Sequence, residues 1–204
     1  YIGTRSSGIV SAGNLVGIRS DGPATIGGDS VGEGNLIAFN LGAGIRLSNS
    51  SVRLVRIRGN SIHSNGLGIS GPLNFTIDHL DPDPGSNDQQ NYPTITSALS
   101  GPGSTVINGS LNSRPDRAYA VDLFSTNICN TVLWNGTVWG QGKTYLGSTN
   151  VSIGSSGLSA FSFSMPSQLT EQYVVATATD PDGNTSIFSQ CVRVGELPFF
   201  IEGT

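Results

Sequence analysis

The sequence has little charge and no long apolar segment. Only 12% of its 204 residues are charged, about half of what is usual in soluble proteins. The net charge is −4 and no stripe of basic residues is present, which argues against an electrostatic grip on nucleic acid or on an anionic membrane. No apolar run approaches the length that spans a bilayer. We therefore expect no nucleic-acid partner and no membrane span.

Helical patterns are nearly absent as well. Apolar residues seldom recur at intervals of three and four, and the capped windows rich in Glu, Lys and Ala that form helices are missing. Glycine is abundant instead, with 28 residues, about twice ordinary usage. This composition predicts an all-β protein built of turns and short strands, in a chain long enough to bury a core.

A Gly-Asn pair recurs in the first part of the chain, with an aliphatic residue close behind it. It occurs at Gly13-Asn14, Gly34-Asn35 and Gly59-Asn60, at separations of 21 and 25 residues. Periods of this length with such short strands indicate a parallel β-solenoid, in which the inward aliphatic residues of one coil stack on the next. Asparagine tolerates the left-handed conformation of a corner and can bond along the stack. We therefore predict a corner ladder made of Asn14, Asn35 and Asn60.

The second half of the chain predicts an antiparallel β-sandwich. Several segments alternate cleanly, as Phe161-Ser162-Phe163-Ser164-Met165 does, and Gly, Pro and Asn turns separate them. The candidate strands are residues 105–111, 119–126, 144–153, 158–165, 173–179 and 186–194, with a further short strand near 131–134. The intervening residues 78–92 are acidic and broken by proline, and we interpret them as a linker. The expected domains are coils over 1–77, the linker over 78–92, the sandwich over 93–194 and an apolar extended tail over 195–204.

Several segments resemble a known family. The stretches "YIGT", "TIGG", "GEGNLIAFN" and "IRGNSIHSNGLGIS" are similar to the right-handed β-helix repeats of large surface and secreted proteins, mostly bacterial. In that family the last coil leads through an acidic loop and a segment like "QNYPTITSA" into an immunoglobulin-like module, whose end is similar to "TATDPDGNTSIFSQCVRV" here. The resemblance implies a right-handed parallel β-helix followed by an immunoglobulin-like sandwich. Cys129 and Cys191 match the family's cysteine pair, which implies a disulfide between them.

Sequons and the expected disulfide favour an extracellular location. Asn-X-Ser/Thr sequons occur at Asn49, Asn74, Asn108, Asn135, Asn150 and Asn184, a number only modestly above chance. In a eukaryotic protein several of them would carry glycans, and Asn135 and Asn184 are the favoured sites because they lie near turns. We therefore expect a secreted or cell-surface glycoprotein.

Residues suited to catalysis are sparse. β-Helices host polysaccharide lyases and hydrolases that work with clustered carboxylates. The candidates are Asp78, Asp81, Asp83, Asp88, His63, His79, Arg53, Arg56 and Arg58. The acids lie in the expected linker and the arginines alternate with aliphatic residues as outward positions of a coil, so we predict no catalytic residue and no cofactor. Asp81 and Asp83 remain candidate calcium ligands, although neither they nor residues 180–184 supply a complete calcium-binding loop.

Two apolar features favour assembly over chemistry. The coil end near Tyr1 begins in mid-pattern, and an open coil end presents inward aliphatic residues and raw strand edges. The tail carries Leu197, Phe199, Phe200 and Ile201 beyond the last expected strand. We predict a structural or adhesive protein that polymerises head to tail, with the coil end of one copy meeting the sandwich or tail of the next.

Three alternatives stay open. The tail could fold back on its own sandwich or begin a following domain, which would make the chain a spacer. The chain could bind carbohydrate, with Trp134, Trp139, Tyr145 or Tyr92 as stacking platforms for sugar rings, although these aromatic residues fit a sandwich core as well. It could also belong to a polysaccharide-degrading enzyme whose catalytic coils lie upstream of Tyr1.

Overall fold

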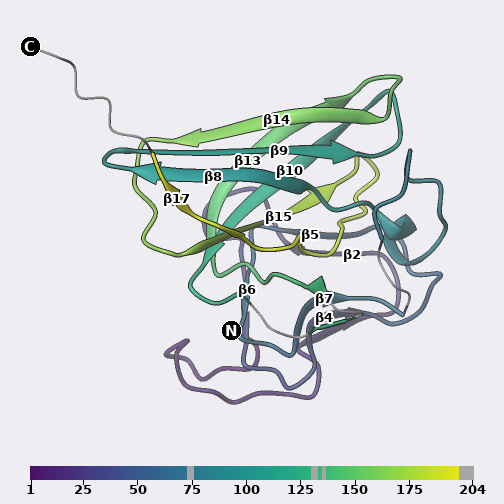
Figure 1. Ribbon diagram of the computed structural model, residues 1–204. Coiled ribbons are helices and arrows are strands. Elements are labelled where there is room, and N and C mark those ends of the chain that lie inside the picture. Colours follow the sequence, from purple (N-terminus) through teal and green to yellow (C-terminus); the bar gives the residue numbers. More distant parts are fainter. Residues whose placement is uncertain (73–75, 130–132, 135–136, 198–204) are drawn as a thin grey trace, which may run out of the picture.

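The computed structural model describes residues 1–72, 76–129, 133–134 and 137–197, with 133–134 and 137–138 described by their backbone alone. Within these ranges the only helical element is the short 3₁₀ turn η1 (Ser86–Gln89), and strands make up the rest of the regular structure. The predicted all-β class is confirmed. No helix of the described ranges is long and apolar enough to cross a membrane. Figure 1 shows the short strands of the first 70 residues beneath the longer strands that follow them.

The first 70 residues form three small parallel sheets. Their strands are β1 (Ile18–Ser20), β2 (Ala24–Gly27), β3 (Leu36–Ala38), β4 (Ala43–Leu47), β5 (Val55–Arg58), β6 (Ser61–His63) and β7 (Leu67–Ser70). The sheet orders are β1-β4-β7, β2-β5 and β3-β6, so each strand pairs with the strand one circuit further along the chain. The registers align isoleucines in columns, which are Ile2–Ile37–Ile62, Ile18–Ile45–Ile69 and Ile26–Ile57. Stacking of like aliphatic side chains buries a continuous core between successive circuits.

The chain from residue 94 onward forms two larger sheets. Their strands are β8 (Thr94–Gly101), β9 (Ser104–Asn112), β10 (Arg117–Thr126), β13 (Thr144–Ile153), β14 (Leu158–Met165), β15 (Tyr173–Thr179), β16 (Val192–Arg193) and β17 (Gly195–Glu196). A separate hairpin consists of β11 (Leu133–Trp134) and β12 (Thr137–Val138). The sheet orders are β13-β10-β15-β16 and β14-β9-β8-β17, antiparallel apart from the β8–β17 pair. Ile107, Leu111, Tyr119 and Val121 belong to the core of these two sheets.

The strands of the second half agree with the alternation in the sequence at most positions. Residues 144–153, 158–165 and 173–179 are strands with the predicted ends, whereas β8 was not predicted. The segment 186–194 is a strand only at β16, because serine side chains replace backbone acceptors before it. Ala176 N donates to Ser189 Oγ over 2.9 Å, and Ala178 N donates to Ser186 Oγ over 3.0 Å.

The tail begins on its own sheet. β17 pairs in parallel with Leu99 and Ser100 of β8, and Leu197 N donates to Ser100 O over 3.1 Å. Residues 195–197 therefore fold back on their own sandwich, which was one of the alternatives left open for the tail. Phe199, Phe200 and Ile201 lie outside the described residues.

The two halves share a core. One cluster of buried side chains contains Ile45 and Val55 from the three parallel sheets, called the coils below. The same cluster contains Phe124, Val175 and Phe188 from the part that follows, whose two larger sheets are called the sandwich. The expected linker forms no strand, as its prolines suggested, yet it is packed against both halves. Its residues Asp81, Ser86, Asn87, Gln90 and Asn91 are at most 3% exposed. Apart from Ser86, they bond to the coils, to the sandwich or to one another.

Asparagine side chains bond along the coils in two columns. In the first, Asn14 N donates to Asn40 Oδ1 over 3.1 Å, and Asn40 N donates to Asn65 Oδ1 over 3.0 Å. In the second, Asn35 N donates to Asn60 Oδ1 over 3.0 Å. The single ladder that we predicted from Asn14, Asn35 and Asn60 is thus divided between two corners, because a full circuit takes 25 or 26 residues and Asn14 and Asn35 are only 21 residues apart.

Replacing Asn40 with alanine should destabilise the coils. Asn40 is 2% exposed, and its side chain accepts from Asn14 N and donates to Asn65 Oδ1. Leaving buried groups without partners costs about 1–3 kcal/mol, so we expect urea denaturation to show a loss of about 2 kcal/mol in the free energy of unfolding. The control Asn150→Ala, at an exposed position of β13, should change this value by less than about 0.5 kcal/mol. Similar losses in both variants would contradict the column.

Candidate functional site

Polar side chains gather where the sandwich meets the last coil. In the described chain β5, β6 and β7 each have a strand partner on one side only. Three segments cover their other edges, namely Asn87 of η1, residues 141–143 before β13 and residues 184–188 after β15. We call these three segments the cap. In Figure 1 the strands of the last coil lie next to the sandwich, and the first residues of the chain lie on the side away from it.

The edge of β5 is bonded by side chains in place of a strand. Val55 N donates to Asn87 Oδ1 over 3.0 Å, and Asn87 Nδ2 donates to Val55 O over 2.8 Å. A primary amide offers an N–H donor and a C=O acceptor in the same arrangement as a peptide group, so Asn87 replaces one residue of a neighbouring strand. Beside it, Ile57 N donates to Thr185 Oγ1 over 2.9 Å and Leu54 N donates to Asn184 Oδ1 over 2.7 Å.

Gln141 continues the first asparagine column beyond the coils. Asn65 N donates to Gln141 Oε1 over 3.0 Å, and Gln141 Nε2 donates to Asn65 O over 2.7 Å. The side chain of Gln141 therefore lies where the asparagine of a further coil would stand. Next to it, Ile62 N donates to Gly142 O over 2.7 Å. These bonds give hydrogen-bond partners to buried backbone groups.

Aromatic packing completes the cap. The Phe188 ring lies against Gly68 of β7, where an added Cβ would come within 2.8 Å of Phe188 Cδ2. Phe188 also meets Phe124 edge to face, with ring centroids 5.4 Å apart. Gly68 is needed because any side chain there would displace the ring that covers the aliphatic stack. Trp139 and Tyr92 likewise pack edge to face, with centroids 5.1 Å apart, and both contact this core.

A buried ion pair also joins the coils to the sandwich. Arg58 and Asp122 are 8% and 1% exposed, and two bonds connect them, at 3.0 Å from Nε and 2.5 Å from Nη2. Burial acts to lower the pKa of Arg58, but the bond to Asp122 and the charges of Asp122 and Asp29 outweigh it, so this pKa is raised. Of the other arginines weighed for catalysis, Arg53 pairs with Asp88 and Arg56 with Asp29. All three therefore hold segments of the chain together.

The sequons differ in accessibility. Asn49 and Asn150 are exposed, and Asn108 is half-buried and donates to Ser97 Oγ over 3.1 Å. Asn184, which we favoured for a glycan, is 1% exposed, and its Nδ2 donates to Asp180 Oδ2 over 2.9 Å. A glycan is attached through this nitrogen, so the folded protein has no room for one there. Asn74 and Asn135 lie outside the described residues.

Cys129 and Cys191 form a disulfide, as the resemblance implied, with their Cα atoms 5.9 Å apart. The bond joins the segment after β10 to the start of β16, across a sequence separation of 62 residues. In the chain-entropy model a loop of this length stabilises the fold by about 4 kcal/mol. The disulfide fits an oxidising compartment.

The acids of the expected linker come together. Carboxylate oxygens of Asp78, Asp81 and Asp83 all lie within 4.8 Å of one another, and no other such group of three is found in the described part of the chain. Burial raises the pKa of Asp81 to about 6, and burial together with the charge of Asp78 raises the pKa of Asp83. His79 is exposed. At the second acidic segment Asp180 accepts from Gly183 N and Asn184 N, both at 2.8 Å, which fits a turn.

A polar pocket lies beside the cap. It has a volume of about 460 Å³, and its described lining includes His63, Asn65, Ile128, Gln141 and Lys143. Burial, followed by the charge of Lys143, lowers the pKa of His63. His63 also meets Phe39 edge to face, at 5.9 Å between centroids. We considered His63 for catalysis together with the acids of residues 78–88. The structure places it at β6 beside the cap, and it is not part of the acidic cluster.

No protein-family model and no curated protein matches this chain. Its function is therefore inferred from its own contacts.

Shortening Gln141 to alanine should weaken the junction between the two halves. The change removes two bonds to the buried backbone of Asn65, at a cost of about 1–3 kcal/mol. Because the halves share a core, we expect one cooperative urea transition whose free energy of unfolding is lower by about 2 kcal/mol. Gln172→Ala, at an exposed position, is the matched control and should stay within about 0.5 kcal/mol of the parent. Loss of the coils alone, with the sandwich unchanged, would show that the cap does not couple them.

His63 should titrate below its ordinary pKa of 6.5. Its folded-state pKa is lower than its unfolded-state pKa, so the unfolded chain binds more protons below pH 6.5 and the free energy of unfolding falls as the pH drops through that value. NMR titration of the imidazole resonances measures the pKa of His63. The free energy of unfolding, measured between pH 7.5 and 5, should fall more steeply in the parent than in His63→Gln. A pKa at or above 6.5 would contradict the assignment.

Proposed function

We propose that this chain is a structural module of an extracellular protein, in which an immunoglobulin-like sandwich closes one end of a short right-handed parallel β-helix and the other end mediates self-association. The observation that carries the proposal is the difference between the two ends of the coils. At one end the cap bonds the edges of β5 and β6 and packs Phe188 against Gly68 of β7. At the other end β1 and β2 have one strand partner each within the described residues, and such edges readily pair with another chain.

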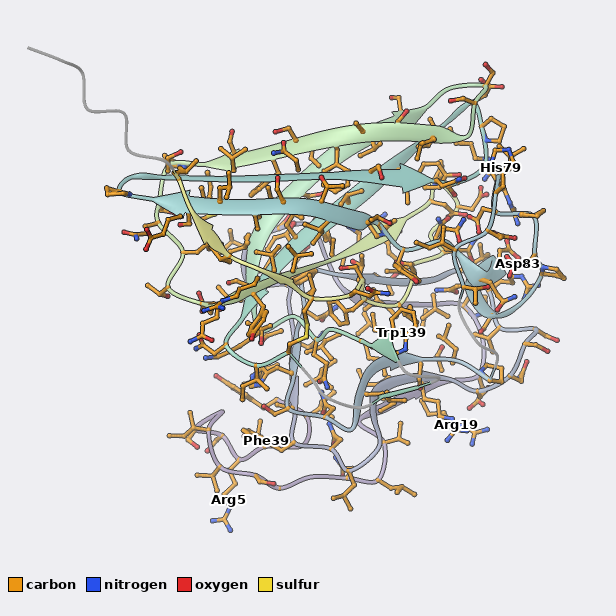
Figure 2. All side chains as sticks on the ribbon, in the orientation of Figure 1. Arg5, Arg19, Phe39, His79, Asp83 and Trp139 are labelled. Atoms are coloured by element: carbon orange, nitrogen blue, oxygen red, sulfur yellow. A yellow bond between two sulfur atoms is a disulfide. The ribbon has the colours of Figure 1, made fainter. Side chains whose placement is uncertain are left out.

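Apolar side chains accompany the open edges. Tyr1, Ile9 and Leu15 are 72%, 80% and 76% exposed, and Val10 is 44% exposed. Figure 2 shows Arg5, from the same part of the chain, at the end of the molecule away from the sandwich. Exposed apolar residues next to unpaired strand edges mark a surface that becomes more stable when it is covered. This surface, residues 1–18, is called the coil end below.

The partner that we propose for the coil end is the sandwich of a second copy. In the described chain β14 is an edge strand that pairs with β9 alone, and its sequence LSAFSFSM contains neither charge nor proline, which are the usual protections of an edge. Figure 1 places β14 and the coil end on opposite sides of the molecule. A contact between two different and opposite surfaces repeats from copy to copy and builds a filament.

The tail has a smaller role in this proposal than the sequence suggested. Leu197 lies on its own sheet, so it is not free to reach another copy without releasing β17. Phe199, Phe200 and Ile201 remain candidate contact residues. The disulfide and the exposed Asn49 and Asn150 support an extracellular, glycosylated form. A spacer within a longer surface protein is the alternative if no self-association occurs.

Ile9→Asp should block self-association without unfolding the protein. Ile9 is exposed at the coil end, and a carboxylate buried in an apolar contact without a partner is strongly unfavourable. We expect multi-angle light scattering and negative-stain electron microscopy to show filaments of the parent at high concentration and monomers of the variant. Ile128→Asp is the matched control, because Ile128 is 69% exposed but follows β10 and lines the pocket beside Gln141 of the cap, not the coil end.

Two outcomes would contradict the proposal. One is a parent protein that stays monomeric at high concentration. The other is equal disruption by Ile128→Asp and Ile9→Asp. Removing residues 198–204 shows whether β14 or the tail provides the contact. Filaments should persist if β14 provides it and should be lost if the tail does.

A further inference from the structure

The acidic cluster in residues 78–83 has the dimensions of a cation site. Calcium binds oxygen ligands at about 2.3–2.6 Å, so two ligands on opposite sides of one ion are about 4.6–5.2 Å apart. The carboxylate oxygens of Asp78, Asp81 and Asp83 lie within 4.8 Å of one another. One ion can therefore contact all three without rearrangement of the backbone. Figure 2 shows Asp83 at the side of the molecule, where the sandwich meets the coils.

Two buried acceptors at the cluster lack partners. Gln89 is 8% exposed, and its Nε2 donates to Asp83 Oδ2 over 2.5 Å, which holds its amide against the Asp83 carboxylate. Within the described structure neither Gln89 Oε1 nor Asp83 Oδ1 has a hydrogen-bond partner. Both atoms are acceptors, and buried acceptors are normally bonded. Gln89 Nε2 also donates to Pro84 O over 3.2 Å, so the amide is fixed beside the carboxylates while its oxygen is unbonded.

The local charge also requires compensation. The segment carries Asp78, Asp81, Asp83 and Asp88, and in the described structure the basic side chains that interact with these acids are Arg53 and Arg114. The four negative and two positive charges leave an excess of two negative charges in a partly buried region. Asp81 is 1% exposed and already accepts from Asn91 N and Ser113 Oγ. Gathering carboxylates at this depth is unfavourable unless a positive charge joins them.

We propose that Asp78, Asp81 and Asp83, together with the side-chain oxygen of Gln89, bind one calcium ion. The ligands are all oxygens, carried on an irregular loop, which suits calcium; magnesium demands a stricter octahedron, and zinc prefers nitrogen and sulfur. The site lies in the same segment as Asn87, whose amide bonds the edge of β5. Calcium would therefore fix the part of the cap that comes from this segment. The proposal is independent of self-association.

Calcium titration of the full-length protein tests the site. At pH 7.5, after removal of calcium with a chelator, isothermal titration calorimetry with calcium chloride should give one ion per chain with a Kd of about 10⁻⁴ M or tighter. Thermal unfolding with about 5 mM calcium should shift the midpoint upward by about 5 °C. The same concentration of magnesium should give a much smaller shift. Absence of binding heat and of any shift would overturn the proposal.

Neutral variants locate the ion. Asp83→Asn and Asp78→Asn keep the side-chain size and should weaken calcium binding by at least about tenfold, while their stability in chelator is unchanged or higher because repulsion is relieved. Asp21→Asn, which removes an equal charge at an exposed position, should bind calcium as the parent does. Equal affinity in Asp83→Asn, Asp78→Asn and the parent would overturn the assignment, whatever the state of assembly.

Discussion

The unpaired edge of the last coil is the constraint on which the rest of the structure depends. A stack of parallel strands ends in backbone donors and acceptors without partners. Each such group that is buried without a hydrogen-bond partner costs about 1–3 kcal/mol. This edge is buried, since Val55, Ile57 and Ile62 are at most 3% exposed. Asn87, Thr185 and Gly142 bond it. Because these three come from distant parts of the chain, this edge is bonded only when the sandwich has folded, and one of the two buried clusters is shared between the halves.

The regular elements were predictable where a period alone determines them. Alternation predicted β13, β14 and β15 with their ends, and the Gly-Asn repeat predicted the parallel circuits. The repeat did not identify the columns, because its glycine is required where the backbone of the next circuit lies too close for a side chain. An added Cβ on Gly13 would lie 2.0 Å from Phe39 O. Asn40 and Asn65 instead follow Phe39 and Ser64, non-glycine residues with φ of 63° and 56°. A search for glycine before asparagine therefore misses Asn40 and Asn65, two of the five asparagines in the columns.

The cap was not predictable, because its parts are polar, dispersed and locally ordinary. Asn184 lies 130 residues from Leu54, and Gln141 lies 76 residues from Asn65. Nothing in its own neighbourhood distinguishes Asn184 from a turn residue or a glycan acceptor, since a D-G turn and a sequon overlap there. Asn87 likewise lies in a segment whose acids and prolines are typical of a linker. In each case the role is decided by what the side chain is buried against, which a single sequence does not contain. Asp81 and Asp83 were identified as candidate ligands from their spacing, but Gln89 was not.

The two ends of the coils differ in what they can bind. A side-chain amide satisfies one or two backbone groups and presents no new strand edge, so Asn87 and Gln141 end the stack where they bind. β1 and β2 present backbone edges, and a strand that paired with either would present another edge in turn. Growth by strand pairing can therefore proceed from the end near Tyr1 but not from the capped end. At the capped end Val55 and Asn65 are already bonded to Asn87 and Gln141, so in the proposed self-association we expect the coil end to take part in the contact.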